Sequence, residues 1–162
     1  MRDTGSGTAP NVNTDQSANT FRFNVTADND APQIDLDPTT PPPDFNYENT
    51  FTEDAGAVNI TDSDAAIADI EGDAIVSMTV TLTNRPDGAL ESIGFTSFDG
   101  ITGTYNPTTG ELILSAVSPA SIASFNQVLQ SLTYNNTSEN PNTADRIITI
   151  TVTDGNTSNT AE

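Results

Sequence analysis

The sequence contains no cysteine, histidine, lysine or tryptophan, and these absences remove most of the side chains that enzymes use. Without histidine there is no Ser-His-Asp triad and no imidazole metal ligand. Without cysteine or lysine there is no thiol nucleophile, disulfide, thiolate zinc site or Schiff base. Paired carboxylates remain, as in glycosidases, but aromatic side chains to grip a sugar are scarce. We therefore expect a protein that is not an enzyme.

Positive charge is also scarce, since four arginines are the only cations and the formal net charge is −19. Nucleic acid is excluded as a partner, because phosphate contacts need clustered Lys and Arg. Anionic membrane surfaces are disfavoured for the same reason, and no apolar run is long enough for membrane insertion. Carboxylates, Asn side chains and backbone carbonyls remain as metal ligands, and they suit Ca²⁺ before Mg²⁺. The acidity could equally serve solubility alone.

Short segments rich in threonine and β-branched residues, separated by turns, dominate the chain and indicate an all-β fold. Their recurrence predicts an antiparallel β-sandwich. The predicted strands are 20–27, 33–37, 50–53, 57–60, 75–83, 101–105, 111–117, 131–136 and 145–155. The predicted core consists of Phe51, Val58, Ile60, Ile67, Val76, Met78, Val80, Leu82, Ile101, Tyr105, Leu112, Leu114, Phe125, Leu129, Leu132, Tyr134, Ile148, Ile150 and Val152.

The segment SPASIASFNQVLQSL differs from the rest, because its apolar residues recur at spacings of three, four and three. This spacing predicts a short amphipathic helix near 119–130 that crosses between strands. Ser118 is the predicted N-cap and Pro119 the first helical residue. The apolar stripe is expected to pack on the core.

A short acidic stretch, NITDSDAAIADIEGD, holds five carboxylates and no cation. Asp62 and Asp64 are two residues apart, and Asp69, Glu71 and Asp73 repeat this spacing. In extended chain such residues point to the same side, where their charges repel unless a cation screens them. The EF-hand pattern fails, because its third ligand and loop glycine are missing. The stretch is therefore either a metal site or a solvated acidic loop.

Further oxygen donors stand at the ends of predicted strands, where a sandwich gathers its loops at two poles. Each of them alone is an ordinary turn residue, and their recurrence at strand ends is what favours a metal site. They are Asp28, Asn29, Asp30, Glu53 and Asp154.

Several of these stretches resemble a known family. The segment ADNDAP is similar to the linker of cadherins and cadherin-like repeats, where an acid-Asn-Asp-x-Pro run binds calcium between successive domains, and ITVTDGNTSNTA resembles their last hairpin. FTEDAGAVNITDSDAAIADIEGD, VTLTNRPDGALESI and LQSLTYNNTSENPNTADRIITITVTDG resemble the cadherin-like tandem repeats of giant bacterial surface adhesins. The resemblance covers about residues 28–162.

The resemblance implies a Greek-key β-sandwich, cadherin-like or immunoglobulin-like, that stacks end to end with neighbouring repeats of the same polypeptide. It implies a non-enzymatic, calcium-stabilised spacer or adhesion repeat of a large bacterial cell-surface or secreted protein, and hence an extracellular location. The residues it implies as calcium ligands, with Asp154 added from its place at a strand end, are Asp28, Asn29, Asp30, Glu53, Asp62, Asp64, Asp69, Glu71 and Asp154.

The expected organisation has three parts. Residues 1–19 form a disordered tail, 20–31 resemble the last strand and linker of a preceding repeat, and 32–162 form a repeat that lacks its own final strand. We hypothesise that Thr20–Ala27 fills the vacant edge beside Arg146–Thr153, within its own chain or by homotypic strand exchange. The other interpretation of Thr20–Ala27 is a loose leftover.

One alternative function belongs to a different class. The chain could be a calcium-shaped module that itself binds a glycan or a protein, with its site in the loops of Asp87–Gly100. The scarcity of aromatic residues argues against this alternative.

Overall fold

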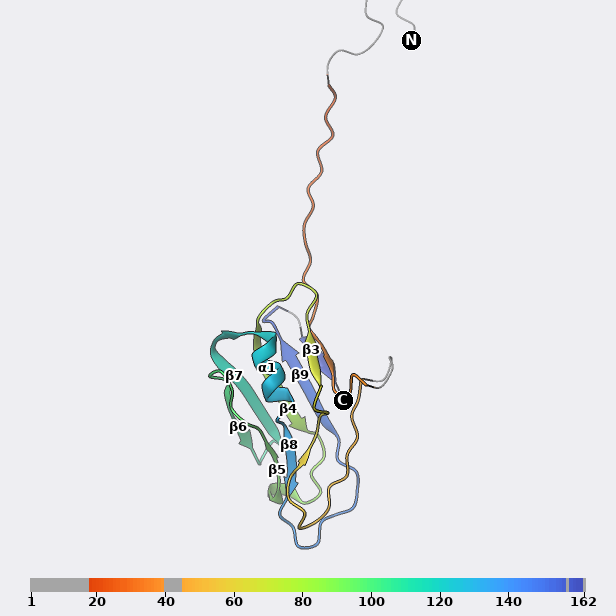
Figure 1. Ribbon diagram of the computed structural model, residues 1–162, viewed down its shortest axis with the longest axis vertical. Helices are drawn as coiled ribbons and strands as arrows, with labels where there is room; N and C mark the ends of the chain where they lie inside the picture. Colours follow the sequence, from red (N-terminus) through yellow and green to blue (C-terminus); the bar gives the residue numbers. More distant parts are fainter. Residues whose placement is uncertain (1–17, 40–44, 157, 162) are drawn as a thin grey trace, which may run out of the picture.

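The computed structural model describes residues 18–39, 45–156 and 158–161, and Figure 1 shows their arrangement. The predicted tail falls almost wholly outside these residues. The elements, in chain order, are β1 (Gln33–Asp35), β2 (Val58–Asn59), β3 (Ala66–Ala68), β4 (Ile75–Leu82), a 3-10 turn (Gly88–Leu90), β5 (Glu91–Gly94), β6 (Thr102–Asn106), β7 (Glu111–Ala120), α1 (Ile122–Leu129), β8 (Thr133–Asn136), β9 (Ile148–Thr153) and β10 (Ser158–Ala161).

The strands form three sheets in which every pair is antiparallel. The largest has the order β10-β9-β4-β7-β6, the second the order β2-β8-β5, and the third joins β1 to β3. Three antiparallel sheets with one helix are consistent with the predicted β-sandwich. The predicted strand at 50–53 is absent, since these residues form an irregular segment and a turn.

The core lies on the inner face of the five-stranded sheet, where alternate residues of β4, β7 and β9 are buried. Met78 pairs with Leu114 on one side and with Val152 on the other, and all three side chains are fully buried. Period-two alternation places every second residue on this face, which is why the pattern identified these positions correctly. Of the predicted core, all but Val76 are buried or pack against the buried cluster.

A β-bulge explains the exception. The register of β4 against β7 shifts between Ile75 and Ser77. Between these two pairs β4 advances two residues, from Ile75 to Ser77, while β7 advances five, from Ser115 to Ala120. The alternation of β4 is broken at this point, and Ile75 is fully buried while Val76 is 41% exposed. The prediction of Val76 as a core residue was therefore wrong, and Ile75 takes its place.

The helix begins three residues later than predicted. Its N-cap is Ser121, whose hydroxyl oxygen accepts a hydrogen bond from the Ser124 amide at 3.1 Å. Strand β7 continues through Ala120, which pairs with Ile75, so Ser118 and its neighbour Pro119 belong to the strand. No helix in the described ranges has the length and apolar character needed to cross a membrane.

Helix α1 is hydrogen-bonded to the segment around β3. The Asn126 side-chain oxygen accepts from the Ile67 amide at 2.8 Å, and the Gln130 side chain donates to the Ala65 carbonyl at 2.9 Å. The Thr61 hydroxyl donates to a carbonyl of the last helical turn. These bonds hold the chain on both sides of the acidic turn that precedes β3.

A buried ion pair holds β5 to the loop before β9. The Arg146 Nη2 atom lies 2.7 Å from Asp87 Oδ2 and 2.9 Å from Glu91 Oε1. The Glu91 side chain is fully buried, and the Asn136 side chain donates to the same Asp87 oxygen at 2.7 Å. The pair thus joins three separate segments of the chain at one end of the sandwich.

The segment Thr20–Ala27 forms no strand with any described residue and is exposed along its whole length. It runs straight away from one end of the sandwich (Figure 1). The edge beside Arg146–Thr153, which this segment was expected to fill, is partly covered by β10, whose Ala161 pairs with Ile150.

Candidate metal centre

Three carboxylates converge on the flank of the sandwich. Asp37, Asp62 and Asp64 each place one oxygen so that the three oxygens lie within 4.8 Å of one another. Asp37 and Asp62 are partly buried, and Asp64 is exposed. The structure therefore brings together the predicted pair Asp62 and Asp64, and adds a third acid from a distant part of the sequence.

Backbone pairing between distant segments brings Asp37 close to Asp62 and Asp64. Strand β1 pairs with β3, and just beyond the pair the Asp62 amide donates to the Leu36 carbonyl at 2.9 Å. A turn follows, in which the Ala65 amide donates to the Asp62 carbonyl at 3.3 Å. Since Asp37 directly follows Leu36, the turn carries Asp62 and Asp64 alongside it.

Local hydrogen bonds orient two of the three carboxylates. The Thr39 hydroxyl and amide donate to Asp37 Oδ1 at 2.5 and 3.2 Å. The Ser63 hydroxyl donates to Asp62 Oδ1 at 2.9 Å. The Ser63 amide also donates to this oxygen. A carboxylate offers about four lone-pair sites, so these bonds leave room for a metal contact on each group.

The arrangement fits a hard divalent cation. Two oxygens on opposite sides of a Ca²⁺ ion, each about 2.4 Å from it, are about 4.8 Å apart. The three carboxylate oxygens satisfy this limit. Three carboxylates this close together repel one another unless a cation screens their charges.

The remaining predicted acids of the stretch do not join this group. Asp69 and Glu71 follow β3, whereas Asp62 and Asp64 precede it. Five residues of extended chain span up to roughly 16 Å, so the strand carries Asp69 away from Asp64. The sequence had suggested one site from these four acids, and the structure divides them between the two ends of β3.

Asp69 instead organises its own turn. Its Oδ1 atom accepts from the Asp73 amide at 3.0 Å, and its carbonyl accepts from the Gly72 amide at 3.2 Å. Its Oδ2 atom is buried and has no hydrogen-bond partner among the described residues. Glu71 and Asp73 are exposed on the same turn.

The predicted linker residues meet the end of β9 at the pole from which Thr20–Ala27 projects (Figure 1). The Asn29 side-chain nitrogen donates to Asp154 Oδ2 at 2.8 Å, and the Asn156 side chain donates to Asn29 Oδ1 at 3.4 Å. Asp28 and Asp30, on either side of Asn29, are exposed. The structure thus brings together Asn29 and Asp154.

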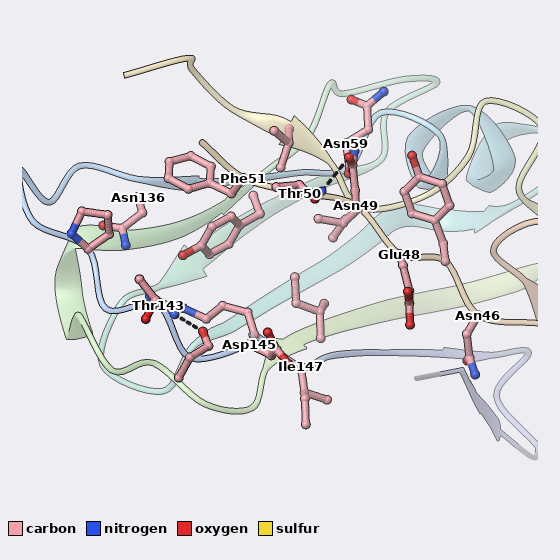
Figure 2. Close-up of a pocket in the computed structure, with 18 of the residues that line it drawn as sticks. Asn46, Glu48, Asn49, Thr50, Phe51, Asn59, Asn136, Thr143, Asp145 and Ile147 are labelled. Atoms are coloured by element: carbon pink, nitrogen blue, oxygen red, sulfur yellow. Dashed lines mark hydrogen bonds between the residues drawn. The ribbon is translucent and has the colours of Figure 1, made fainter. Parts of the chain in front are cut away.

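Glu53 lies elsewhere, beside a groove of about 800 Å³ that is also lined by Asn136, Asn142 and Arg146. The loop between β8 and β9, which carries Asn142 and Arg146, lies at the end of the sandwich opposite the one from which Thr20–Ala27 projects (Figure 1), and Glu53 shares the groove with this loop. Figure 2 shows this groove between the segment that carries Glu48 to Phe51 and the loop that leads into β9.

Sequence reasoning missed Asp37, although a signal was present. Asp35 and Asp37 are two residues apart on either side of the buried Leu36, which is the spacing that singled out Asp62 and Asp64. Only the pairing of β1 with β3 shows that Asp37, and not Asp69, stands beside that pair.

Comparisons with protein families, with curated proteins and with solved structures find no match to this chain. Its function must therefore be argued from its own residues.

Proposed function

We propose that this chain is a non-enzymatic, calcium-stabilised β-sandwich repeat of the Greek-key, cadherin-like type. It acts as a spacer or adhesion repeat in a large, extracellular bacterial surface or secreted protein. One observation carries the proposal: three carboxylate oxygens of Asp37, Asp62 and Asp64 lie within 4.8 Å of one another in a chain of net charge −19.

The ion would stabilise the fold at a point where the chain closes on itself. Asp37 follows β1, whereas Asp62 and Asp64 precede β3, so one cation would clamp the two antiparallel strands together at one end of their sheet. Carboxylates suit Ca²⁺, which takes six to eight oxygens, and backbone carbonyls and water would complete the shell. Binding to the native state alone stabilises it by mass action.

The contact between linker and sandwich supports a role in an array. Asn29 bonds to Asp154 at the end of β9, so the segment that precedes the sandwich is fixed to its pole. A fixed linker transmits orientation from one repeat to the next, which a spacer needs and an isolated binding module does not. The exposed Asp28 and Asp30 stand at the same junction.

Thermal unfolding with Ca²⁺, with Mg²⁺ and with a chelator tests the calcium site. At a free Ca²⁺ concentration a hundred times the Kd, stabilisation is about 2.7 kcal/mol. For a domain of this size that raises the melting temperature by roughly 10 °C. Mg²⁺ should act more weakly, because it demands a tighter octahedral shell.

The paired variant Asp62→Asn/Asp64→Asn supplies the decisive comparison, with Glu139→Gln/Asp145→Asn as its control. Both remove two negative charges, but Glu139 and Asp145 are exposed and lie outside the trio. We expect the first variant to lose the response to Ca²⁺ and to melt at or above the native temperature in chelator, because repulsion is relieved. Coincident native curves with Ca²⁺ and with chelator, or an equal Ca²⁺ response in both variants, would contradict the site.

A further inference from the structure

Strand β6 (Thr102–Asn106) forms one margin of the five-stranded sheet, on the flank of the sandwich beside β7 (Figure 1). It pairs with β7 over its whole length and without a bulge. No strand of the described residues pairs with its other edge. The described chain is continuous from residue 45 to residue 156, so the segments on both sides of β6 belong to it. The outer edge of β6 therefore offers backbone N–H and C=O groups to another strand.

Strand β6 lacks the features that usually prevent strand addition at a sheet edge. Such edges are commonly protected by a charged side chain, a proline or a bulge. The sequence of β6, TGTYN, contains no charge and no proline, although the chain holds 23 acidic residues. The acid Glu111 belongs to β7 and lies one strand in from the edge. Two copies of this acidic chain can therefore meet along β6 without placing like charges directly opposite each other.

The sequence of β6 is complementary to an antiparallel copy of itself. When two β6 strands pair about a two-fold axis through Thr104, Thr102 lies opposite Asn106, and Gly103 lies opposite Tyr105. Thr104 then faces its own counterpart, and threonine pairs across antiparallel strands are stabilising. The Tyr105 ring stands beside Gly103, which has no side chain to obstruct it, and an aromatic residue opposite an edge glycine stabilises a sheet.

The charges that flank β6 are also complementary in this register. Asp99 is exposed in the turn that precedes the strand. Arg85 lies at the turn that follows the strand, where its guanidinium donates to the Pro107 and Thr108 carbonyls. The axis through Thr104 brings the first turn of each copy beside the second turn of the other, because the two turns lie at similar distances from Thr104 along the chain. Asp99 of one copy thus approaches Arg85 of the other at both ends of the paired strands.

We propose that the β6 edge binds the β6 edge of a second copy of this chain, antiparallel and centred on Thr104, so that the two five-stranded sheets join into one. Main-chain hydrogen bonds between the two edges supply affinity, and the side-chain pairs supply register. The contact is isologous and closes as a dimer. Two such short edges bury less than the roughly 1,600 Å² of a standard interface, so a single pair associates weakly. The pairing depends neither on the calcium site nor on the proposed array.

A single introduced cysteine tests this contact, because the native sequence contains none. Directly opposite residues of antiparallel strands have Cα atoms about 4.5–5.5 Å apart, which a disulfide can span. Thr104→Cys should therefore form disulfide-linked dimers under mild oxidation. Ser115→Cys is the matched control, since Ser115 is exposed on β7 and its two copies lie at least three strand spacings apart, or about 14 Å. We expect Thr104→Cys to form dimers at least about tenfold faster than Ser115→Cys at the same protein concentration.

Two further cysteine variants test the register. Thr102→Cys and Asn106→Cys should each form dimers slowly when oxidised alone and rapidly when mixed, because the antiparallel register places residue 102 of one copy opposite residue 106 of the other. Mass spectrometry identifies the mixed disulfide. If each variant alone forms dimers as fast as the mixture, the copies meet in a parallel register or by random collision, and the proposal is overturned.

Charge variants test the association without a covalent link, by sedimentation velocity at high protein concentration. Thr104→Asp and Thr104→Lys should each be monomeric, because like charges then lie directly opposite each other, and an equimolar mixture of the two should dimerise. Thr104 is exposed, so both variants should keep the native melting temperature, and Ser115→Asp should associate as the native chain does. The proposal is overturned if Thr104→Cys forms dimers no faster than Ser115→Cys, if Thr104→Asp alone still dimerises, or if the Asp and Lys mixture stays monomeric.

Discussion

Replacing Arg146 by methionine should destabilise the fold through the carboxylate that it leaves behind. Glu91 is fully buried, and its Oε1 atom accepts from Arg146 Nε at 3.2 Å, from Arg146 Nη2 at 2.9 Å and from the Asp87 amide at 2.9 Å. Its other oxygen is buried with no hydrogen-bond partner in the described residues. Without Arg146, one backbone donor faces a buried negative charge.

The burial of Glu91 sets how much the free energy of unfolding falls in the Arg146→Met variant. Breaking a buried ion pair by removing one partner costs about 3–5 kcal/mol. The Arg146 side chain is still 12% exposed, so we take the lower end, about 3 kcal/mol. For a domain of this size, that lowers the melting temperature by roughly 10 °C.

Calorimetry and urea unfolding of the variant measure the loss, with Arg85→Met as the matched control. The Arg85 guanidinium donates to the Pro107 and Thr108 carbonyls in the turn before β7, and we expect its replacement to cost about 1 kcal/mol. Adding Glu91→Gln to Arg146→Met removes the unpaired charge and should restore about 1 kcal/mol or more. An Arg146→Met variant that is as stable as Arg85→Met, or a double variant that recovers nothing, would show that the unpaired Glu91 charge does not cause the loss.

Three further predictions follow from local geometry. Ile75→Ala should lower the free energy of unfolding by about 2–5 kcal/mol and Val76→Ala by less than about 1, because the bulge buries only the first; equal losses in urea would contradict the bulge. Ser121→Ala should cost about 1 kcal/mol through the lost N-cap and Ser118→Ala close to nothing, with calorimetry as the check. Burial, and then the nearby Glu91, raise the pKa of Tyr134 above its ordinary 10.0. Since the folded state holds this proton more tightly, stability is lost as pH rises through and above about 10, and Tyr134→Phe should flatten that fall in pH-dependent urea titrations.

The alternation of apolar and polar residues in the sequence was sufficient to identify the strands that bury one face against the core. Strands β4, β7 and β9 alternate in sequence, so their inward residues were identified before any pairing was known. It failed after Ile75, where the period is interrupted, and at the start of α1, where Ser121 and not Ser118 is the N-cap. It also missed β3 and β5, because their sequences, AIA and ESIG, contain only one β-branched residue each and no aromatic residue.

At the acidic site, too, the sequence identified some of the residues and the tertiary structure decided which of them lie together. The composition alone left oxygen as the only class of metal ligand, and the two-residue spacing of Asp62 and Asp64 marked them as a pair. That Asp37 completes the trio, while Asp69 lies beyond β3, depends on the register of β1 against β3. Spacing along the chain reports which side chains share a face of one strand. Which acids from different strands lie within reach of one ion is decided by pairing between distant segments, and no local pattern in the chain encodes that distance.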